Sequence, residues 1–124
     1  MASLLTKQPH MNTHTCQDTD LAHILDTELL NWNVVATPLV DATNAVQIEI
    51  MRQFTFDSFQ SAIDFMTQTA PGCDTAKHHP RWENTWKTLT IYLSTWDEGL
   101  YKITEKDIKL AKYFDQAYSD FLQI

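Results

Sequence analysis

The segment DTAKHHPRW, residues 74–82, separates two different patterns in this 124-residue chain. Apolar residues at helical spacing precede it, and an alternation typical of a strand follows it. Pro80 favours an extended backbone at His79, so the segment predicts a change from helix to strand. Histidine has an unperturbed pKa of about 6.5 and exchanges protons near neutral pH, which makes His78 and His79 candidate acid–base residues.

The sequence before this segment first predicts a helix and a short strand. Thr19 is expected to cap the helix, whose apolar residues recur at helical spacing until it ends near Leu30. Residues 31–35 then alternate between polar and apolar side chains. This alternation predicts a strand with Trp32 and Val34 on the same face.

A second strand and a second helix are expected next. Residues 46–54 alternate as in a half-buried strand, with Arg52 as the one charged residue on the buried face. Residues 57–60 resemble a capping box, with Asp57 as the cap. Pro71-Gly72 is expected to kink or stop the helix, with residues 73–77 as a further turn. The apolar stripe of this helix comprises Phe59, Ala62, Ile63, Met66 and Ala70.

After the histidine pair, residues 82–95 read as one long strand, with Leu89, Ile91 and Leu93 on its core face. The strongest local signal in the chain follows at residues 103–108. Thr104 is expected to cap a helix, and Asp107 sits at the third helical position of the capping box. This last helix is expected to run to about residue 121, with a wide apolar stripe that can pack on a sheet and also on a partner helix.

Helices and strands are mixed without regular alternation, which indicates the α+β class. We expect a single antiparallel sheet of about four strands with two to three helices packed on one face. Residues 1–18 show no sustained periodicity and are expected to form a disordered or frayed tail, so that residues 19–124 form the only domain.

Composition narrows the class of function. The formal net charge is -7 and the pI is about 5.0. An acidic surface repels phosphate backbones, so we expect no direct contact with nucleic acid. The chain has neither a secretory signal nor an apolar stretch long enough to cross a membrane, which predicts a cytoplasmic protein without membrane contact.

Metal and disulfide sites are weakly indicated. Cys16 and Cys73 are expected to be free thiols in a reducing compartment. His10, His14 and Cys16 have metal-ligand chemistry but lie in the expected tail, where nothing holds a coordination geometry. The pair of histidines with Cys73 lies on one short segment without a second ligand pair, so no metal is predicted. Taken alone, the tripeptide at 78–80 leaves open whether the histidines are catalytic or are surface or capping residues.

Several motifs in order make the signal more specific. They are Asp74, His78-His79-Pro80-x-Trp82-x-Asn84, Leu93-Ser94-Thr95 and the segment Thr104 to Ala111, with Trp32 and the Phe54–Phe65 pattern before them. Together they resemble the signature of the pterin-4a-carbinolamine dehydratases, also known as dimerisation cofactors of a homeodomain transcription factor. The resemblance covers residues 19–120, in the element order expected above.

This resemblance implies dehydration of 4a-hydroxytetrahydropterin to quinonoid dihydropterin, a step that recycles the pterin of aromatic amino-acid hydroxylation. It implies histidine acid–base catalysis without a metal or organic cofactor. It also implies a homodimer or homotetramer. The catalytic residues would be His78, at the leaving hydroxyl, and His79, in proton transfer. The substrate would be bound by Asp74, Lys77, Pro80, Ser94, Thr95, Trp96 and Asp97.

The sequence departs from the family pattern at the end of the strand. Trp96 stands where most members carry a third histidine, and Asp74 stands where glutamate is commoner. An indole exchanges no protons, although it can stack on a flat ring or fill a pocket. Two hypotheses therefore follow: an active dehydratase, or a non-catalytic relative that binds pterin or another protein through the same fold.

Overall fold

The computed structural model describes residues 18–38, 46–97 and 99–123. Within these ranges the chain forms three helices and six strands. The helices are α2 (Asp18–Thr27), α3 (Phe59–Ala76) and α4 (Glu105–Leu122). The strands are β1 (Asn33–Pro38), β2 (Val46–Thr55), β3 (Arg81–Thr85), β4 (Thr88–Leu93), β5 (Thr95–Asp97) and β6 (Leu100–Lys102).

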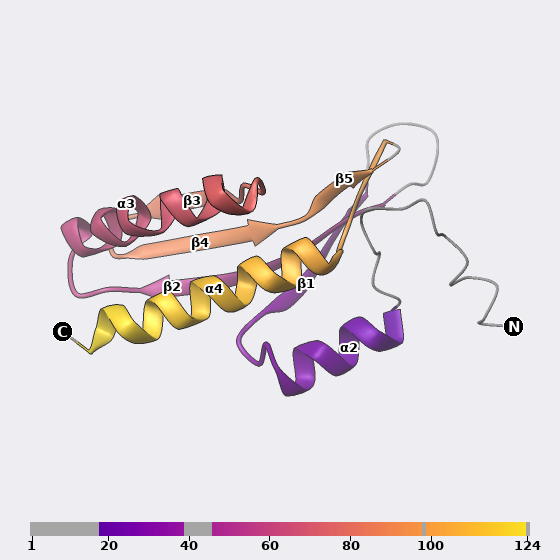
Figure 1. Cartoon of the computed structure of the whole chain (residues 1–124), viewed down its shortest axis with the longest axis horizontal. Coiled ribbons are helices and arrows are strands. Elements are labelled where there is room, and N and C mark those ends of the chain that lie inside the picture. Colours follow the sequence, from indigo (N-terminus) through magenta and orange to yellow (C-terminus); the bar gives the residue numbers. More distant parts are fainter. Residues whose placement is uncertain (1–17, 39–45, 98, 124) are drawn as a thin grey trace, which may run out of the picture.

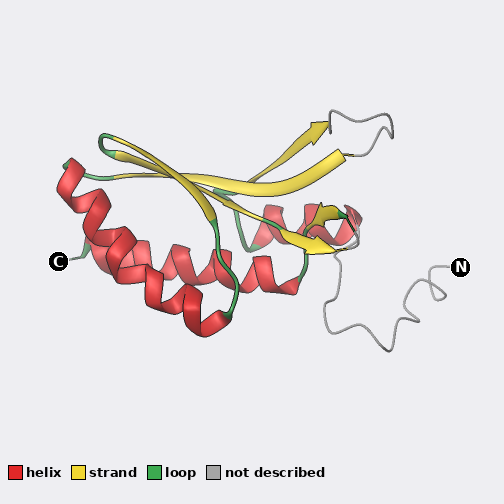
Figure 2. Ribbon diagram, turned by 90° about the horizontal axis from the view of Figure 1, so that it is seen from above, coloured by secondary structure: helices red, strands yellow, loops and turns green. Residues whose placement is uncertain are grey.

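Four strands form an antiparallel sheet in the order β1-β2-β4-β3, and β5 pairs with β6 in a small second sheet. Figure 1 shows α3 and α4 running along the sheet. Figure 2 shows the helices on one side of the long strands. The other side of the sheet carries no helix within the described residues, and we call it the open face. The α+β class and the one-sided sheet are thus confirmed.

The core lies between the sheet and the helices. On the helix side of β2 and β4, alternate residues are fully buried, among them Ile50, Phe54 and Leu89. Arg52, the charge predicted on this buried face, forms a 2.6 Å ion pair with Asp115. Its guanidinium also lies over the ring of Phe54, so the charge is both paired and packed on an aromatic face.

The long strand expected over residues 82–95 is wrong, because β3 and β4 form a hairpin there. Trp86 turns the chain with φ +53°, a left-handed conformation that a bulky side chain rarely adopts. The Asn84 amide braces the turn by donating to the carbonyls of Trp86 (3.2 Å) and Thr88 (3.1 Å). The turn residues expected in such a hairpin, glycine or asparagine, are replaced by this side-chain brace.

Pro71-Gly72 neither stops nor splits the second helix, since α3 runs from residue 59 to residue 76 with Pro71 inside it. Gly72 serves close packing instead. A Cβ atom there would lie 2.2 Å from the hydroxyl oxygen of Tyr113 on α4. The missing side chain therefore lets the two helices approach, and the further turn expected at 73–77 is part of α3.

Two finer expectations at helix starts are wrong. Thr19 lies inside α2, which already includes residue 18. Ser58, rather than Asp57, caps α3, and its hydroxyl accepts from the amide of Ser61 at 3.0 Å.

Trp32 and Val34 share a face as expected, since Trp32 contacts Phe54 on the helix side and Val34 is paired with Ile50 of β2. Trp32, which precedes β1, is buried there, whereas Val34 is exposed.

The apolar stripe of α3 is rotated from its expected position. Ala62 is buried as expected, but Phe59 is exposed. The other buried residues of this helix are Phe65, Thr69 and Cys73. Phe65 lies at the centre of the aromatic core, with ring centroids 5.7 Å from Phe54 and 5.2 Å from Phe56.

The capping box at Thr104 and Asp107 is confirmed, and α4 extends to Leu122. Its stripe is buried at the start of the helix and partly buried toward residue 121. In the described ranges, no helix is long and apolar enough to cross a membrane. Residues 1–17 of the predicted tail, with His10, His14 and Cys16, lie outside the described residues, whereas Asp18 already belongs to α2. The boundary between tail and domain stays a prediction.

Candidate active site

The two histidines follow the end of α3. Lys77 closes the helix in the left-handed conformation, with φ +55°, and the amide of His78 donates to the carbonyl of Cys73 at 3.2 Å. The chain then enters β3 at Arg81 in an extended conformation, so successive side chains point to opposite sides. His78 faces the helix side of the sheet, and His79 faces the open face.

His78 is held by a buried carboxylate. Its Nε2 atom lies 2.6 Å from Oδ1 of Asp107. The His78 side chain is 11% exposed and that of Asp107 is 0% exposed. The second oxygen of Asp107 accepts from the Thr95 hydroxyl at 2.7 Å and from the Thr104 amide at 2.9 Å. Asp107, the capping-box residue of α4, thus also orients His78.

This network decides which nitrogen of His78 can meet a ligand. An ionised carboxylate only accepts hydrogen bonds, so Nε2 of His78 carries the proton that it shares with Asp107. The Nδ1 atom has no hydrogen-bond partner in the described part of the chain. The ring is therefore fixed at one nitrogen and free to exchange a proton at the other.

His79 has a partner of the same type in a different setting. Its Nε2 atom lies 2.9 Å from Oδ1 of Asp74, in the last turn of α3. Both side chains are exposed, His79 to 63% and Asp74 to 79%. Water competes for both groups, so this pair holds the ring less firmly than the buried one does.

His79 lines a cleft of about 310 Å³ on the open face. The cleft collects residues from β2, β3, β4 and β6 and from the segment before β3. They are Gln47, Glu49, His79, Pro80, Arg81, Tyr92, Ser94 and Tyr101. We call it the open-face cleft. It contains a buried carboxylate, a guanidinium and an imidazole, which suit a polar, flat ligand.

His78 lines a separate cleft of about 530 Å³ between the end of α3 and the start of α4, which we call the helix-side cleft. Its floor includes Gly72 and Leu110, and Tyr113 forms part of its wall. Lys106 and Lys109 place two ammonium groups beside it. The histidine pair therefore stands between two clefts rather than inside one.

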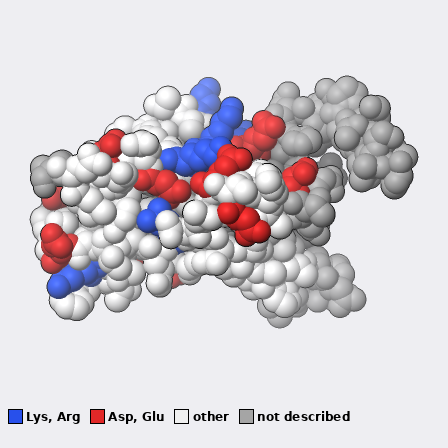
Figure 3. Space-filling view, turned by 90° about the horizontal axis from the view of Figure 1, so that it is seen from below, with Lys and Arg blue, Asp and Glu red and all other residues white. Residues whose placement is uncertain are grey.

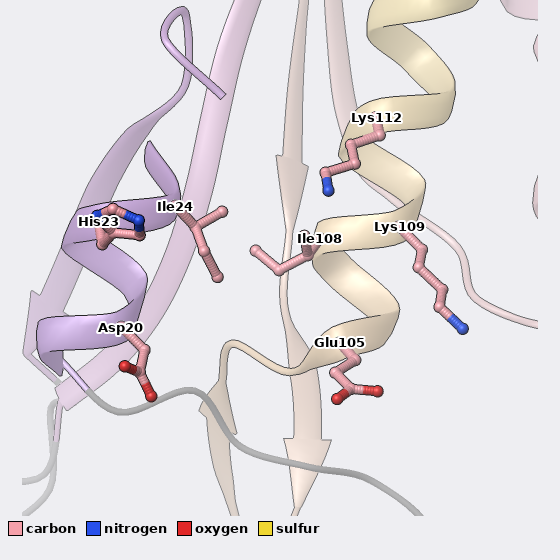
Figure 4. A pocket seen from close by; sticks show the side chains of 7 residues that line it. All are labelled: Asp20, His23, Ile24, Glu105, Ile108, Lys109 and Lys112. Carbon is pink, nitrogen blue, oxygen red and sulfur yellow. The ribbon is translucent and has the colours of Figure 1, made fainter. Parts of the chain in front are cut away.

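A third hollow, of about 400 Å³, lies between α2 and α4 and is lined by neither His78 nor His79. Figure 4 shows Ile24 and Ile108 pointing toward each other across it, while Lys109 extends away from α2. Lys112 forms an ion pair with Glu28 nearby. On the face seen in Figure 3, acidic and basic side chains lie next to each other, so this face carries no broad patch of one charge.

The structure brings part of the predicted site together. His79, Pro80 and Ser94 line the open-face cleft. Thr95 belongs to the network that holds His78. Asp74, Lys77 and Trp96 do not line either histidine cleft: Asp74 holds His79, Lys77 caps α3, and Trp96 is 62% exposed. Asp97 lies in β5.

The main residues missed from the sequence are Glu49, Arg81 and Tyr92. Glu49 is buried and forms a two-point contact with Arg81, Nη2 to Oε1 at 2.9 Å and Nε to Oε2 at 3.3 Å. The guanidinium carbon of Arg81 lies 3.7 Å from the centre of the Tyr92 ring. One pattern in the sequence could have indicated them. Each of the three residues alternates along its strand with core residues, so all three lie on the face opposite the helices.

Metal ligation has no support among residues 18–38, 46–97 and 99–123, where no cluster of three or more His, Cys, Asp or Glu side chains could hold an ion. Cys73 is a free, buried thiol. Burial, and then the charge of Asp74, raise the pKa of this thiol to about 11, so it is protonated at neutral pH.

The sequence of this chain is similar to those of proteins in a known family. Residues 14–117 match the sequence profile of a family described as pterin 4 alpha carbinolamine dehydratase. A provisionally named pterin-4-alpha-carbinolamine dehydratase of Prochlorococcus marinus is 40% identical over 98 residues, 76% of this chain and 97% of that protein. A relative with the same provisional name from Afipia carboxidovorans is 41% identical over 70 residues, 56% of this chain and 68% of that protein.

The fold has a counterpart among crystal structures. A transcriptional coactivator/pterin dehydratase from Brucella melitensis superposes with a TM-score of 0.67 at 26% sequence identity. The match covers 85% of this chain and 99% of that protein.

Proposed function

Because this chain belongs to the pterin-4a-carbinolamine dehydratase family, we propose that it removes water from 4a-hydroxytetrahydropterin by histidine acid–base catalysis. The observation that carries the proposal is the 2.6 Å contact between His78 and the buried Asp107, next to a second histidine on a cleft. A carboxylate that fixes one ring nitrogen and leaves the other free is the arrangement that general acid–base catalysis requires.

The reaction needs one proton given and one taken. The C4a–O bond breaks, its electron pair goes to the hydroxyl oxygen, and an acid protonates that oxygen so that it leaves as water. The nitrogen lone pair at N5 forms the C4a=N5 double bond, and a base removes the N5 proton. We assign His78 to the leaving hydroxyl and His79 to the N5 proton, with the Nδ1 atoms as the exchanging nitrogens.

The pterin ring would bind in the open-face cleft, where His79, Pro80 and Ser94 meet. Its volume of about 310 Å³ is suited to a small bicyclic ligand. His79 lines this cleft, whereas His78 lines the helix-side cleft, so the proposal requires the leaving hydroxyl of the pterin to reach the edge where the two clefts meet. The remaining predicted contacts, from Asp74, Lys77 and Thr95 to Asp97, would act at this edge.

The test is a direct dehydration assay. A hydroxylase reaction supplies 4a-hydroxytetrahydropterin, and its loss is followed with the wild-type protein, with the His79→Ala and His78→Ala variants, and in buffer. We expect the wild type to accelerate the reaction and each variant to lose roughly 100-fold or more of that acceleration. A wild-type rate equal to that of buffer would refute the activity, and an unchanged rate in both variants would refute the assigned site.

A second candidate function is a non-catalytic role for the same fold, as a pterin-binding or protein-interaction module. The observation that favours it is Trp96, which replaces the family's third histidine and is 62% exposed. The Trp96→His variant separates the two candidates. It should raise the dehydration rate if a missing imidazole limits catalysis, and a rate that stays at the wild-type level would show that Trp96 is not the limiting residue.

We also propose a cytoplasmic protein that assembles as a homodimer or homotetramer. The end of α4 supports this proposal, because Phe121 is only partly buried and Leu122 is exposed, which leaves apolar surface for contact with a second copy. Sedimentation velocity would decide, because a single species with the mass of one chain would contradict this proposal.

A further inference from the structure

The guanidinium of Arg81 lies in the open-face cleft, where neighbouring side chains contact it. Arg81 contacts Glu49 through Nε and Nη2, at 3.3 and 2.9 Å, and it contacts Glu83 through Nη1 at 3.1 Å. Its guanidinium carbon lies 3.7 Å from the centre of the Tyr92 ring. The planar group is therefore fixed in position and orientation by three neighbours.

The buried carboxylate makes this arrangement firm. The side chain of Glu49 is only 6% exposed, and leaving such a charge without a partner is costly. Arg81 is the cation that pairs with it, and the two-point contact fixes the plane of the guanidinium. The hydrogen bond that Arg81 donates to Glu49 is also the main cause that raises the pKa of Arg81, so the group stays charged.

One surface of this guanidinium remains open. Tyr92 covers one face, and the two carboxylates occupy the edges. The side chain is nevertheless 51% exposed, and it lines the cleft together with His79 and Pro80. The exposed surface is therefore the second face of the plane, turned toward the space where a ligand would lie.

A flat, charged group that is already fixed in place before a ligand binds can serve as a surface on which a ring stacks; we call it a stacking platform. Guanidinium groups stack on π systems, and the attraction is larger when the ring is rich in electrons. The pyrimidine half of a reduced pterin is flat and electron-rich. We infer that Arg81, held by Glu49 and backed by Tyr92, stacks on the pterin ring and positions it beside His79.

The inference rests on the proposed function, so its test measures binding and turnover separately. The probe is 6-methyl-tetrahydropterin, which has no hydroxyl at C4a to lose, titrated without oxygen in a calorimeter. The variant Arg81→Lys keeps the positive charge and loses the planar guanidinium group. We expect its Kd for the probe, and its KM in the dehydration assay, to rise about tenfold. The kcat should stay within about twofold of the wild type, because the reacting histidines are untouched.

Two further variants make the result specific to stacking. Arg52→Lys is the matched control, since Arg52 also pairs with a carboxylate and lies over an aromatic ring, but on the helix side of the sheet. Its Kd and KM should not change. Glu49→Gln removes the carboxylate that orients the Arg81 guanidinium, while Arg81 keeps its charge. This variant should weaken probe binding by a smaller factor than Arg81→Lys does.

The outcomes distinguish this inference from the proposed function. If the wild type binds the probe and dehydrates its substrate, but Arg81→Lys matches it in Kd and KM, the platform is refuted and the activity stands. If the wild type binds the probe, Arg81→Lys weakens binding and no dehydration occurs, the platform stands and the activity is refuted. Absence of probe binding to the wild type would overturn the platform.

Discussion

Adjacent histidines in this protein have the same kind of partner in opposite surroundings. His78 and His79 each lie within 3 Å of an aspartate, at 2.6 and 2.9 Å. The partner of His78 is fully buried, whereas the partner of His79 is 79% exposed. Partner type and distance alone therefore do not describe a site, because water screens one pair and is excluded from the other.

The buried partner also has a structural task. Asp107 closes the capping box of α4 and accepts from Thr95 and Thr104 while it holds His78. The exposed partner, Asp74, contacts His79 and has no comparable network within the described residues. Substitution of the two aspartates should therefore separate stability from local orientation.

The largest expected effect is on stability. Asp107→Ala leaves the Thr104 amide, the Thr95 hydroxyl and His78 without their acceptor in a buried place, so we expect the free energy of unfolding to fall by about 3 kcal/mol. Asp74→Ala is the matched control at an exposed position, where we expect a change within about 0.5 kcal/mol. Urea denaturation measures both, and equal losses would contradict the contrast between the two sites.

The second effect is on turnover. Asp107→Asn preserves the shape but places an amide that can also donate against His78, so the ring loses its fixed acceptor. We expect kcat for dehydration to fall about 100-fold, and by clearly less in Asp74→Asn, where water also hydrates the ring. The assay is run on folded protein, checked by circular dichroism. A larger loss in Asp74→Asn would reverse the assignment of the firmly held histidine.

A third prediction sharpens the contrast in packing between the two clefts. The helix-side cleft is walled by Tyr113 against Gly72, where an added Cβ would lie 2.2 Å from the hydroxyl oxygen. Gly72→Ala should therefore be destabilising, or at best neutral, in the wild-type background. In a Tyr113→Ala background it should stabilise by about 1 kcal/mol through helix propensity. The double-mutant cycle should show a coupling of roughly 1–2 kcal/mol, and additivity would contradict the close contact.

A further effect concerns the pH dependence of stability. The folded protein holds the Cys73 thiol protonated, with a pKa of about 11, because the group is buried and lies near Asp74. The unfolded thiol ionises near about 8.5. Stability from this group is complete below that value and is lost as the pH rises toward 11.

Unfolding free energies at pH 8 and above pH 10, in reducing buffer, test this expectation. The decline should be smaller in Cys73→Ala than in the wild type. Tyr113 also has a raised pKa, mainly through burial, so Tyr113→Phe is measured in parallel to separate its contribution. An identical decline in the wild type and in Cys73→Ala would show that the thiol ionises equally in both states.

The sequence predicts this fold well where the signal is local. The capping box at Thr104 and the alternation along β2 depend on residues a few positions apart, and both are confirmed. The hairpin at Trp86 was missed because the turn lacks glycine and depends on the side chain of Asn84. The continuous α3 was missed because Pro71-Gly72 was read as a break, whereas Gly72 serves the close approach of Tyr113 from α4, a contact that local sequence does not reveal.

In the candidate site, too, only the local features could be predicted from the sequence. The histidine pair is visible in the sequence, but its partners are not. Asp107 is 29 positions from His78, and Glu49 is 32 positions from Arg81. No periodicity relates residues so far apart, so their contacts follow only from the packing of α4 and of β2 against the end of α3 and the start of β3.

By itself, the sequence determined the alternation along β2, where α4 begins, and which family the motifs at residues 74–111 resemble. These properties depend on neighbours within a few residues, where covalent geometry fixes the spacing. Only the tertiary structure decided that Asp107 holds His78 and that Arg81 lies between Glu49 and Tyr92. Those contacts depend on which groups lose water when separate elements pack together, and that loss of water is a property of the folded chain as a whole.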